Sequence, residues 1–522
     1  MIKPSYSFED ALALTGFGKF NYILIFLSGS ILGASYVDIG GVNLILAISQ
    51  CELELTNVHK GILSSIGYLG IILSSHLWGF LADTKGRKRI MVPALLMSFI
   101  ITVISSTATS FWVLVLFRFL QGICICAPQS IIYAFLGEFH CAKNRARVLL
   151  VGNFEIIFLV LFLRNPLSNL CVSASVVYSI TCLQSPIFGV TVLNQVWSFH
   201  IPVINLIFRP WRLFLLLCGL SSVLCAIVML IYIPESPKYT FAQGDEEKTL
   251  LILQTMFVRN TGKSASEYEV KSIEKDKEFV ESVVQHSNFF KFMWTQTVPL
   301  FKRPHLRNTL TACFLQFTIC ITSNGFYTFF PEILNKVYLW LDSDPMHVTS
   351  TVCQIIDHYG LSSNSNEMAT CLTKLEPSTF VNVTIVILLH LLGWSVIAVI
   401  INRTGKLIII VFIMFGGAAC SLLLVFIEIP MVSVYLYTLL LATGMNMSVV
   451  NSSTVELFPT SLRATAISIS MMTGRLGSIV GSNAVGLALN NFCKYTWLIP
   501  AAFLTASGCL AFTIPNINKR NK

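Results

Sequence analysis

Charged side chains are scarce in this chain. Asp, Glu, Lys and Arg make up 12% of the residues, whereas soluble domains carry about a quarter. Hydrophobic residues make up 54%, and apolar runs of about 20 residues, each long enough to cross a bilayer, recur along the chain. The composition excludes a soluble domain and indicates an all-α integral membrane protein in contact with the lipid bilayer.

Sequence patterns for catalysis and for metal or nucleotide binding are also missing. The sequence has no phosphate-binding glycine loop and no hydrolytic triad, and its 15 cysteines follow no metal-ligand or redox spacing. His76 and His390 stand alone in apolar surroundings, which is typical of core histidines. We therefore expect no enzyme activity, no cofactor and no metal site.

The apolar runs predict twelve transmembrane spans. They are expected at 21–48, 61–82, 90–108, 111–136, somewhere within 148–200, 211–233, 308–336, 379–401, 407–428, 430–452, 465–488 and 495–514. The fifth is ambiguous because two apolar stretches, 148–163 and 172–196, lie where an odd number of crossings must fit. Either one stretch is re-entrant or packed outside the bundle, or residues near 164–190 come from an imperfect gene model.

The first 20 residues lack the basic start and cleavage site of a secretory signal. We expect the first span to be an uncleaved anchor. Ser7-Phe8-Glu9-Asp10 has the pattern of a helix start, and Gly16 and Gly18 would end that helix. The alternatives for this segment are a short interfacial helix and an irregular tail.

Positive charges gather in alternate loops. The residues concerned are Lys85, Arg87, Lys88, Arg89, Lys143, Arg145, Arg147, Arg403, Lys406, Arg463, Lys519, Arg520 and Lys522. Lys and Arg collect on the cytoplasmic side of membrane proteins, so both termini are predicted to be cytoplasmic. The net charge of +9 then reflects topology, and we expect no nucleic-acid partner.

The loop 337–378 is acidic and is predicted to lie outside. It holds Cys353 and Cys371. These are expected either to form one disulfide or to remain two free thiols.

A charged stretch divides the spans into two sets of six. We expect an N-terminal bundle with its short helix at 1–234, a cytoplasmic linker at 235–306 and a C-terminal bundle at 307–522. The linker charges have the spacing of short solvated helices.

The two halves repeat each other. The spacing from Glu138 to Arg145 recurs from Glu456 to Arg463. The turn Asp83-x-x-Gly86-Arg87-Lys88 has a degraded counterpart at 402–406. A duplicated six-span unit explains both matches, and it predicts parallel repeats about a pseudo-two-fold axis with a binding site between them at mid-membrane depth.

Several of these motifs resemble a known family. The segment from Gly79 to Arg89 resembles the loop motif of the major facilitator superfamily, with Thr84 where Arg is common. Arg118-Phe119-Leu120-Gln121-Gly122 resembles its fourth-helix motif, and Pro234-Glu235-Ser236-Pro237-Lys238 resembles the motif that closes the sixth helix in the sugar-porter and organic-cation branches. Phe8-Glu9-Asp10-Ala11 and Pro210-Trp211-Arg212-Leu213-Phe214 are similar to the synaptic vesicle glycoprotein two and related-protein group. The resemblance implies a major facilitator fold of twelve helices.

The resemblance also implies a cytoplasmic gate, in which ion pairs across the two bundles close the inner side. Its candidates are Asp83, Gly86, Arg87, Glu138, Arg145, Glu235, Glu456 and Arg463. Asp83, beside the Gly86 turn, can accept hydrogen bonds from a neighbouring helix N-terminus. The alternative is that these charges hold loops at the membrane interface and set orientation.

Two of the charges inside spans, Asp38 and Arg118, are candidates for coupling. A carboxylate at the depth of Asp38 costs roughly 2.5–3.5 kcal/mol on insertion scales and normally faces a cavity or a partner, which suits coupling to protons or cation binding. The alternative is a shallow carboxyl near the outer mouth. Arg118 serves either coupling or anion binding, or else it is a structural residue bonded to backbone carbonyls.

Other polar residues within spans are candidates for a substrate cavity. They are Asn43, Gln121, Gln316, Asn324, Tyr327, Trp394, Asn446 and Asn451. For each one alone, hydrogen bonding between helices is an equally physical role. Gln316 and Asn324 are predicted to share a helix face.

These observations predict a monomeric, multi-pass transporter of a small organic solute, an organic cation or a polar metabolite, that works by alternating access with protons as a coupling ion. Its membrane would be the plasma membrane or an intracellular vesicle. The alternative is a non-transporting membrane scaffold or binding protein that resembles the synaptic vesicle proteins. The degraded motif at 402–406 favours that alternative.

Overall fold

The computed structural model describes most of the 522 residues. The described residues are 6–50, 52–141, 144–145, 148, 197–202, 206–274, 294, 297–343, 349–361, 385, 389–390, 392–393, 396–397, 400–401, 403–458, 460–489 and 492–513. Most of the expected span at 379–401 and most of the ambiguous interval 148–200 therefore lie outside the described residues.

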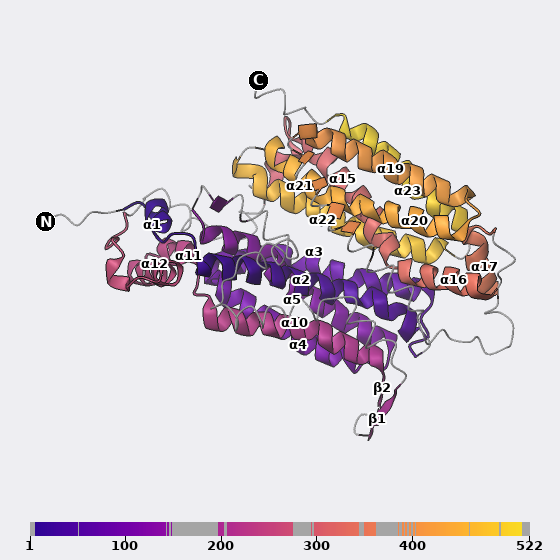
Figure 1. Cartoon of the computed structure of the whole chain (residues 1–522), viewed down its shortest axis with the longest axis horizontal. Coiled ribbons are helices and arrows are strands. Elements are labelled where there is room, and N and C mark those ends of the chain that lie inside the picture. The colour runs from indigo at the N-terminus through magenta and orange to yellow at the C-terminus, as the bar shows by residue number, and fades with distance from the viewer. Residues whose placement is uncertain are drawn as a thin grey trace.

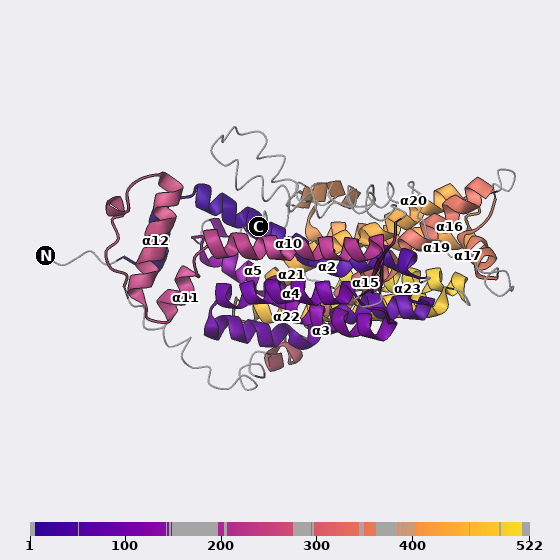
Figure 2. The ribbon, with the colours of Figure 1, turned by 90° about the horizontal axis from the view of Figure 1, so that it is seen from below.

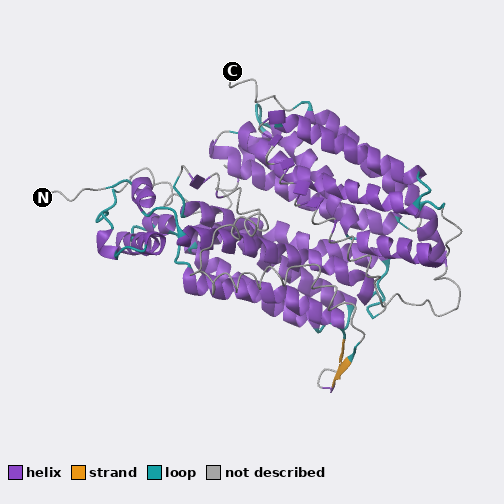
Figure 3. Ribbon diagram, viewed as in Figure 1, coloured by secondary structure: helices purple, strands orange, loops and turns teal. Residues whose placement is uncertain are grey.

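Long helices build the N-terminal half, drawn from indigo to magenta in Figure 1. They are α2 (Lys19–Ser49), α3 (Asn57–Lys85), α4 (Arg87–Ser106), α5 (Phe111–Glu138) and α10 (Pro210–Tyr232). A short antiparallel pair, β1 (Phe199–Ile201) with β2 (Leu206–Phe208), precedes α10. Figure 3 shows this hairpin as the strand element beside a body of helices. The apolar runs predicted these helices because each is long enough to cross a bilayer.

A group of short helices covers one end of the N-terminal half (Figures 1 and 2). It comprises α1 (Phe8–Leu14), α11 (Pro237–Ala242), α12 (Glu246–Thr261) and the 3-10 turn η2 (Ala265–Glu267). Ser7 caps α1 by accepting the Asp10 backbone N–H, as the sequence pattern predicted. We call this the α12 end of the molecule.

The C-terminal half is also helical and is drawn from orange to yellow in Figure 1. Its elements are η3 (Val298–Phe301), α15 (Leu306–Tyr327), α16 (Phe330–Ser343), α17 (Val352–Leu361), α19 (Lys406–Phe426), α20 (Pro430–Leu441), η5 (Ala442–Met445), α21 (Asn446–Leu457), α22 (Thr460–Ala488) and α23 (Cys493–Ala511). α16 and α17 lie opposite α12 in both views, and we call this the α16 end.

The described residues contain seven helical segments long and apolar enough to cross a membrane. They begin at Lys19, Asn57, Arg87, Phe111, Pro210, Lys406 and Pro430. Each coincides with an expected span.

The repeat predicted from the sequence has a counterpart in the backbone. Gly86 precedes α4 with φ 108° and ψ 144°, and Gly405 precedes α19 with φ 84° and ψ 148°. Both conformations favour glycine because a side chain would be strained there. The degraded motif at 402–406 thus keeps the turn that matters to the backbone.

The halves approach each other most closely where α3 crosses α22. A Cβ at Gly61 would lie 2.8 Å from the Ser482 backbone oxygen, and one at Gly486 would lie 2.5 Å from the Asn57 backbone oxygen. Glycine therefore allows backbone contact between these helices. Both contacts involve the first turns of α3, near the α16 end.

The disulfide prediction was wrong in its partner. Cys353 on α17 is bonded to Cys493 at the start of α23, a residue 140 positions away, and not to Cys371. The bond ties the segment after α16 to the last described helix, because both lie at the α16 end.

Candidate functional site

A buried polar cluster surrounds Asp38, which lies on α2 and is 1% exposed. Its Oδ2 accepts hydrogen bonds from Ser98 on α4 (3.3 Å) and from Ser222 on α10 (3.1 Å). Oδ1 has no hydrogen-bond partner among the described residues. Asp38 is therefore buried inside the N-terminal half, between α2, α4 and α10.

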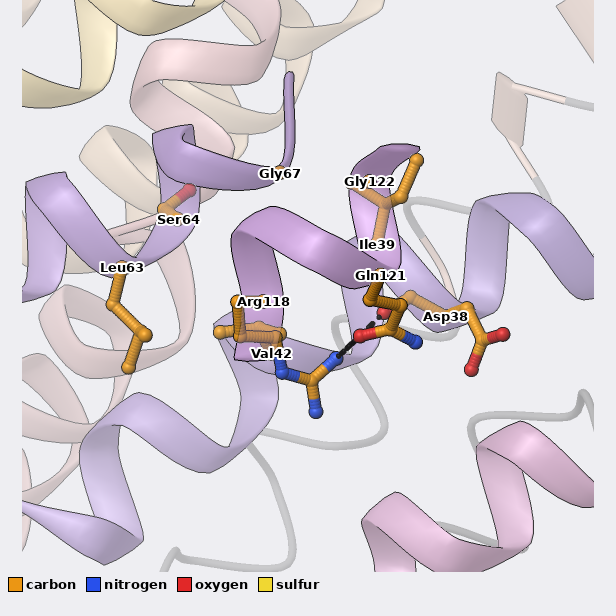
Figure 4. A pocket seen from close by; sticks show the side chains of 9 residues that line it. All are labelled: Asp38, Ile39, Val42, Leu63, Ser64, Gly67, Arg118, Gln121 and Gly122. Carbon is orange, nitrogen blue, oxygen red and sulfur yellow. Dashed lines mark hydrogen bonds between the residues drawn. The ribbon is translucent and has the colours of Figure 1, made fainter. Parts of the chain in front are cut away.

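Arg118 on α5 lies beside this carboxylate without forming an ion pair. Its Nη1 donates to the Asp38 backbone oxygen (3.1 Å) and to Gln121 Oε1 (2.6 Å). Figure 4 shows the guanidinium turned toward Gln121 and the Asp38 carboxylate pointing away. Within the described part of the chain, Nε and Nη2 of Arg118 have no hydrogen-bond partner. Two buried opposite charges thus keep spare hydrogen-bonding capacity.

A small cavity adjoins this cluster (Figure 4). Its lining includes Asp38, Ser64, Arg118 and Gln121, and it has room for about one water molecule. That is enough space for a proton carrier and too little for an organic solute. In this conformation the cavity beside Asp38 and Arg118 therefore has no room for direct binding of an organic solute.

A second cluster lies at the α12 end, around Arg87. Its guanidinium forms ion pairs with Glu138 on α5 (2.9 Å) and with Asp83 on α3 (2.7 Å). Arg87 and Glu138 are 15% and 12% exposed, whereas Asp83 is 63% exposed. The Arg87–Glu138 pair is therefore partly shielded from water, and Asp83 is a surface partner.

Glu235 makes the contact with a helix N-terminus that was predicted for Asp83. Its carboxylate accepts the backbone N–H groups of Lys88 (2.9 Å) and Arg89 (3.2 Å) at the start of α4. A Cβ at Gly86 would lie 2.8 Å from Glu235 Oε2, so glycine leaves space for this contact. A carboxylate at a helix N-terminus is stabilised by the unpaired N–H groups and the helix dipole. Burial and then the Glu235 charge raise the pKa of Tyr239.

Arg145 also remains within the N-terminal half. It pairs with Glu9 on α1 at 2.7 Å and donates to the Gly137 carbonyl at 3.0 Å. Nearby, burial, and to a lesser extent the positive charge of Arg145, lowers the pKa of His140, whose Nδ1–H donates to the Leu136 carbonyl at 2.7 Å.

The gate prediction expected ion pairs across the two halves. Within the part of the chain that the structure describes, the ion pairs of Arg87 and Arg145 are made inside the N-terminal half. The side chain of Glu456 lies outside the described residues, and Nε of Arg463 has no hydrogen-bond partner in the described ranges. Of the predicted gate residues, Asp83, Arg87 and Glu138 thus form ion pairs with one another, whereas Arg145 pairs with Glu9.

An ion pair between the halves does exist, at the opposite end. Lys60 on α3 pairs with Glu332 on α16, and it also donates to Gln50 Oε1 at 3.0 Å. Lys336 reaches the other oxygen of Glu332 at 3.1 Å. Lys60 is 1% exposed and Glu332 is 12% exposed. We call Lys60, Glu332 and Lys336 the α16-end latch.

Sequence reasoning missed this latch. Lys60 lies at the edge of an apolar run, where a lysine is ordinarily interpreted as facing water. Ser64 and Thr328 add a hydroxyl contact across the halves at 2.7 Å, and Asn483 donates to Ser65 at 2.9 Å. The sequence signal that could have revealed this ion pair was that Lys60 and Glu332 are predicted to lie at the same membrane depth.

The expected cavity residues mostly join helices. Gln316 donates to Asn451 (2.6 Å), Asn324 to Ser478 (2.9 Å), and Asn446 to the Ile410 carbonyl (3.1 Å). Gln316 and Asn324 therefore face different helices, α21 and α22. Three further candidates are Asn43, which is buried, Tyr327, which is half-buried, and Trp394, which lies outside the described residues.

Comparison with known proteins identifies the family to which this chain belongs. A model of the Major Facilitator Superfamily matches residues 20–482. The chain belongs to the major facilitator superfamily. It is a multi-pass membrane protein whose family and fold are those of transporters rather than of enzymes. The predicted all-α membrane fold is thereby confirmed.

The chain is also similar to individual proteins, the synaptic vesicle glycoproteins. The chain is 25% identical to synaptic vesicle glycoprotein 2B of Homo sapiens over 347 residues, which are 63% of this chain and 47% of the relative. It is 24% identical to synaptic vesicle glycoprotein 2A of Rattus norvegicus over 351 residues, 63% of this chain and 44% of the relative. The chain spans about half the length of these relatives.

Solved structures share the fold. A partially occluded inward open conformation of the xylose transporter XylE from E. coli aligns with a TM-score of 0.61 at 14% identity, covering 95% of this chain and 99% of that one. A crystal structure described as a D-xylose-proton symporter aligns with a TM-score of 0.58 at 13% identity, covering 95% and 97%.

Proposed function

We propose that this protein transports a small organic solute by alternating access and couples that movement to protons. Residues 1–234 and 307–522 would be the two moving bodies, joined by a cytoplasmic linker at 235–306. The α12 end would face the cytoplasm together with both termini, and the α16 end would face outward. The protein would act as a monomer in the plasma membrane or a vesicle membrane, and its synaptic vesicle relatives favour the vesicle.

One observation carries this proposal: the ion pairs of the two ends are distributed differently. At the α16 end, Lys60 and Glu332 pair across the halves. At the α12 end, the ion-pair partners of Arg87 among the described residues are Asp83 and Glu138 of its own half. A transporter closed on one side and ready to open on the other has this arrangement, because the charges that separate must find water or new partners.

Asp38 is the proposed proton carrier. Its buried carboxylate has one oxygen without a hydrogen-bond partner in the described structure. An ionised group in that situation is costly, and protonation removes the charge. Ser98 and Ser222 come from two different helices, so a change in the charge of Asp38 acts directly on how α2, α4 and α10 pack.

The first test is uptake by purified protein in liposomes. A mixed pool of metabolites would be offered with and without a proton gradient, and accumulation would be read by mass spectrometry. We expect gradient-dependent uptake that Asp38→Asn abolishes and that Asp342→Asn, at an exposed carboxylate on α16, leaves intact. Undiminished uptake by a folded Asp38→Asn variant would remove Asp38 from the mechanism.

The alternative, a non-transporting membrane scaffold, requires a separate test. Ser64→Cys with Thr328→Cys would cross-link the halves where the native hydroxyls are 2.7 Å apart. Oxidation should stop transport and reduction should restore it, while the single Ser64→Cys variant stays active. If neither the oxidised nor the reduced folded protein takes up any solute, the scaffold function is favoured. Equal uptake by both forms would show that transport does not need the halves to separate at this contact.

A further inference from the structure

A third charge lies within the helices, and the polar network around Asp38 does not use it. Arg475 is half-buried near the middle of α22. None of the ion pairs found among the described residues includes it. A cation at membrane depth is costly and, where it persists, faces a partner, a cavity or a substrate path.

The packing of α22 on α3 shows what Arg475 faces. As α3 advances from Asn57 to Gly61, its partner on α22 recedes from Gly486 to Ser482, so the helices run antiparallel in a fixed register. The same register, continued along both helices toward the α12 end, places Tyr68 opposite Arg475. Arg475 thus lies between the two halves, inward of the α3–α22 contact that closes the α16 end.

Electrostatic proximity agrees with this register. The Arg475 charge acts on the phenols of Tyr36 on α2 and Tyr68 on α3, and on the thiols of Cys126 and Cys320. Tyr36 is 60% exposed although it belongs to a spanning helix. Phenols from two helices of one half are therefore within electrostatic range of a guanidinium from the other half.

The carboxylates that could neutralise Arg475 are occupied elsewhere. Asp38 accepts from Ser98 and Ser222, and Glu332 is held by Lys60 and Lys336. Among the described residues, the charge presented between the halves is therefore positive. The Asp38 carboxylate is bonded to α4 and α10 inside the N-terminal half, whereas an organic cation beside Arg475 would face a like charge.

We propose that Arg475, with the hydroxyls of Tyr36 and Tyr68, binds the acidic group of a small organic anion. A guanidinium presents a planar fork of donors that matches a carboxylate or a phosphate, and phenols supply further donors and an apolar face for the rest of the molecule. The two sides of the site belong to different halves, so binding would draw them together. This assignment rests on the proposed transport function and specifies its substrate class.

The test measures binding and uptake separately. Benzoate, hexanoate and phenyl phosphate would be compared with benzamide and hexanamide and with benzylamine and hexylamine. Binding to the purified protein would be read from the thermal unfolding midpoint, and uptake from liposome accumulation. We expect the oxyanions to raise the midpoint and the matched amides and amines to leave it unchanged.

Variants of Arg475 and Tyr36 test whether anion binding occurs at the proposed site. Arg475→Gln should weaken anion binding by about tenfold or more, as expected for loss of charged hydrogen bonds. Arg475→Lys, which keeps the charge without the fork, should weaken it by a smaller factor, and Tyr36→Phe by less again. Arg307→Gln, at an exposed arginine on α15, is the matched control. Arg475→Lys also serves if Arg475→Gln does not fold.

The outcomes separate the two proposals. Binding that depends on Arg475 without any uptake supports the anion site and contradicts transport. Uptake that ignores Arg475, or prefers amides or amines, supports transport and overturns the site. Failure of every oxyanion to bind the folded protein also overturns the site.

Discussion

The two ends of the molecule use ion pairs in opposite ways. At the α16 end, Lys60 and Glu332 join the two halves in a nearly buried pair. At the α12 end, the ion pairs that Arg87 and Arg145 form with described residues stay within their own half. The charges at the α16 end must separate for the halves to part, whereas those at the α12 end brace one half whatever the other half does.

Burial decides how much each pair is worth. Removing one partner of a buried ion pair costs about 3–5 kcal/mol because the remaining charge is left in a low dielectric. Exposed pairs contribute about 0–1 kcal/mol. The α16 end also contains a buried pair within one half, since Arg212, 0% exposed, binds Glu52 at 2.6 Å. The Arg212–Glu52 pair is buried but does not join the halves. Comparing it with the Lys60–Glu332 pair therefore distinguishes the effect of burial from the effect of joining the halves.

The largest expected effect is the loss of this pair within the N-terminal half. Arg212 donates to the Ser106 and Ala108 carbonyls at 2.7 Å each, besides binding Glu52. Arg212→Ala should lower the free energy of unfolding by about 3–5 kcal/mol. Arg209→Ala is the matched control, because Arg209 is 39% exposed and lies 3.7 Å from the same carboxylate.

Thermal unfolding and label distances would be measured on both variants. The distance between labels on Glu54 and Lys494, which lie on different halves at the α16 end, should not change in either. A lower stability with unchanged distances identifies Arg212 as a brace of the fold. A changed distance would mean that this pair also controls the state of the transporter.

The next largest effect concerns the α16-end latch. Glu332→Gln leaves Lys60, 1% exposed, with Gln50 as its remaining partner. We expect the closed α16 end to lose about 1.5–3 kcal/mol, which moves the balance toward the open form by about tenfold or more. The same pair of labels would report a population at longer distance.

The control for the latch is Asp357→Asn, at an exposed carboxylate on α17. It should leave the label distances as they are. If Glu332→Gln lowers the unfolding temperature without lengthening any distance, the latch is a structural pair like Arg212 and Glu52. The Lys60–Glu332 pair would then not differ in function from the ion pairs within one half.

The sequence predicted much of the fold. Apolar runs located the helices, and the repeated turn at Gly86 and Gly405 was recovered with matching backbone angles. These features are local, because hydropathy and glycine act over a few residues of chain. Asp38 and Arg118 were recognisable for the same reason, since a charge inside an apolar run needs no tertiary information to be noticed.

Contacts between distant segments were not predictable in this way. Lys60 and Glu332 are 272 residues apart, and only the packing of α3 against the start of α16 makes them neighbours. The partner of Cys353 depended likewise on where α17 meets α23. Arg475 is a different case. It lies inside a predicted span, as Arg118 does, so the sequence alone was sufficient to identify it as a charge within a helix.

A moderate effect is expected from the cluster at the α12 end. Glu138→Gln removes a pair whose partners are 15% and 12% exposed, and Arg87 keeps Asp83 and the Ala82 carbonyl. The free energy of unfolding should fall by about 1 kcal/mol. Asp83→Asn, at a side chain 63% exposed, should cost under about 0.5 kcal/mol.

Distances across the α12 end would show whether this cluster also gates. Because both pairs lie within one half here, neither variant should change the distance between labels on Lys85 and Arg307. A shift in the Glu138→Gln variant alone would show that Glu138 takes a partner from the other half in a second state. The gate implied by the family resemblance would then be correct for that state.

The smallest effect is expected where α1 docks. Arg145 and Glu9 are 33% and 47% exposed, so water and salt screen their attraction and Glu9→Gln should cost under about 0.5 kcal/mol. Tyr268 donates a buried hydrogen bond to the Ala11 carbonyl at 2.7 Å, and Tyr268→Phe should cost about 1 kcal/mol. Hydrogen exchange of the α1 amides should therefore accelerate more in Tyr268→Phe than in Glu9→Gln. The reverse order, abolished by 0.5 M salt, would mean that the ion pair holds α1, and that charge rather than burial organises the α12 end.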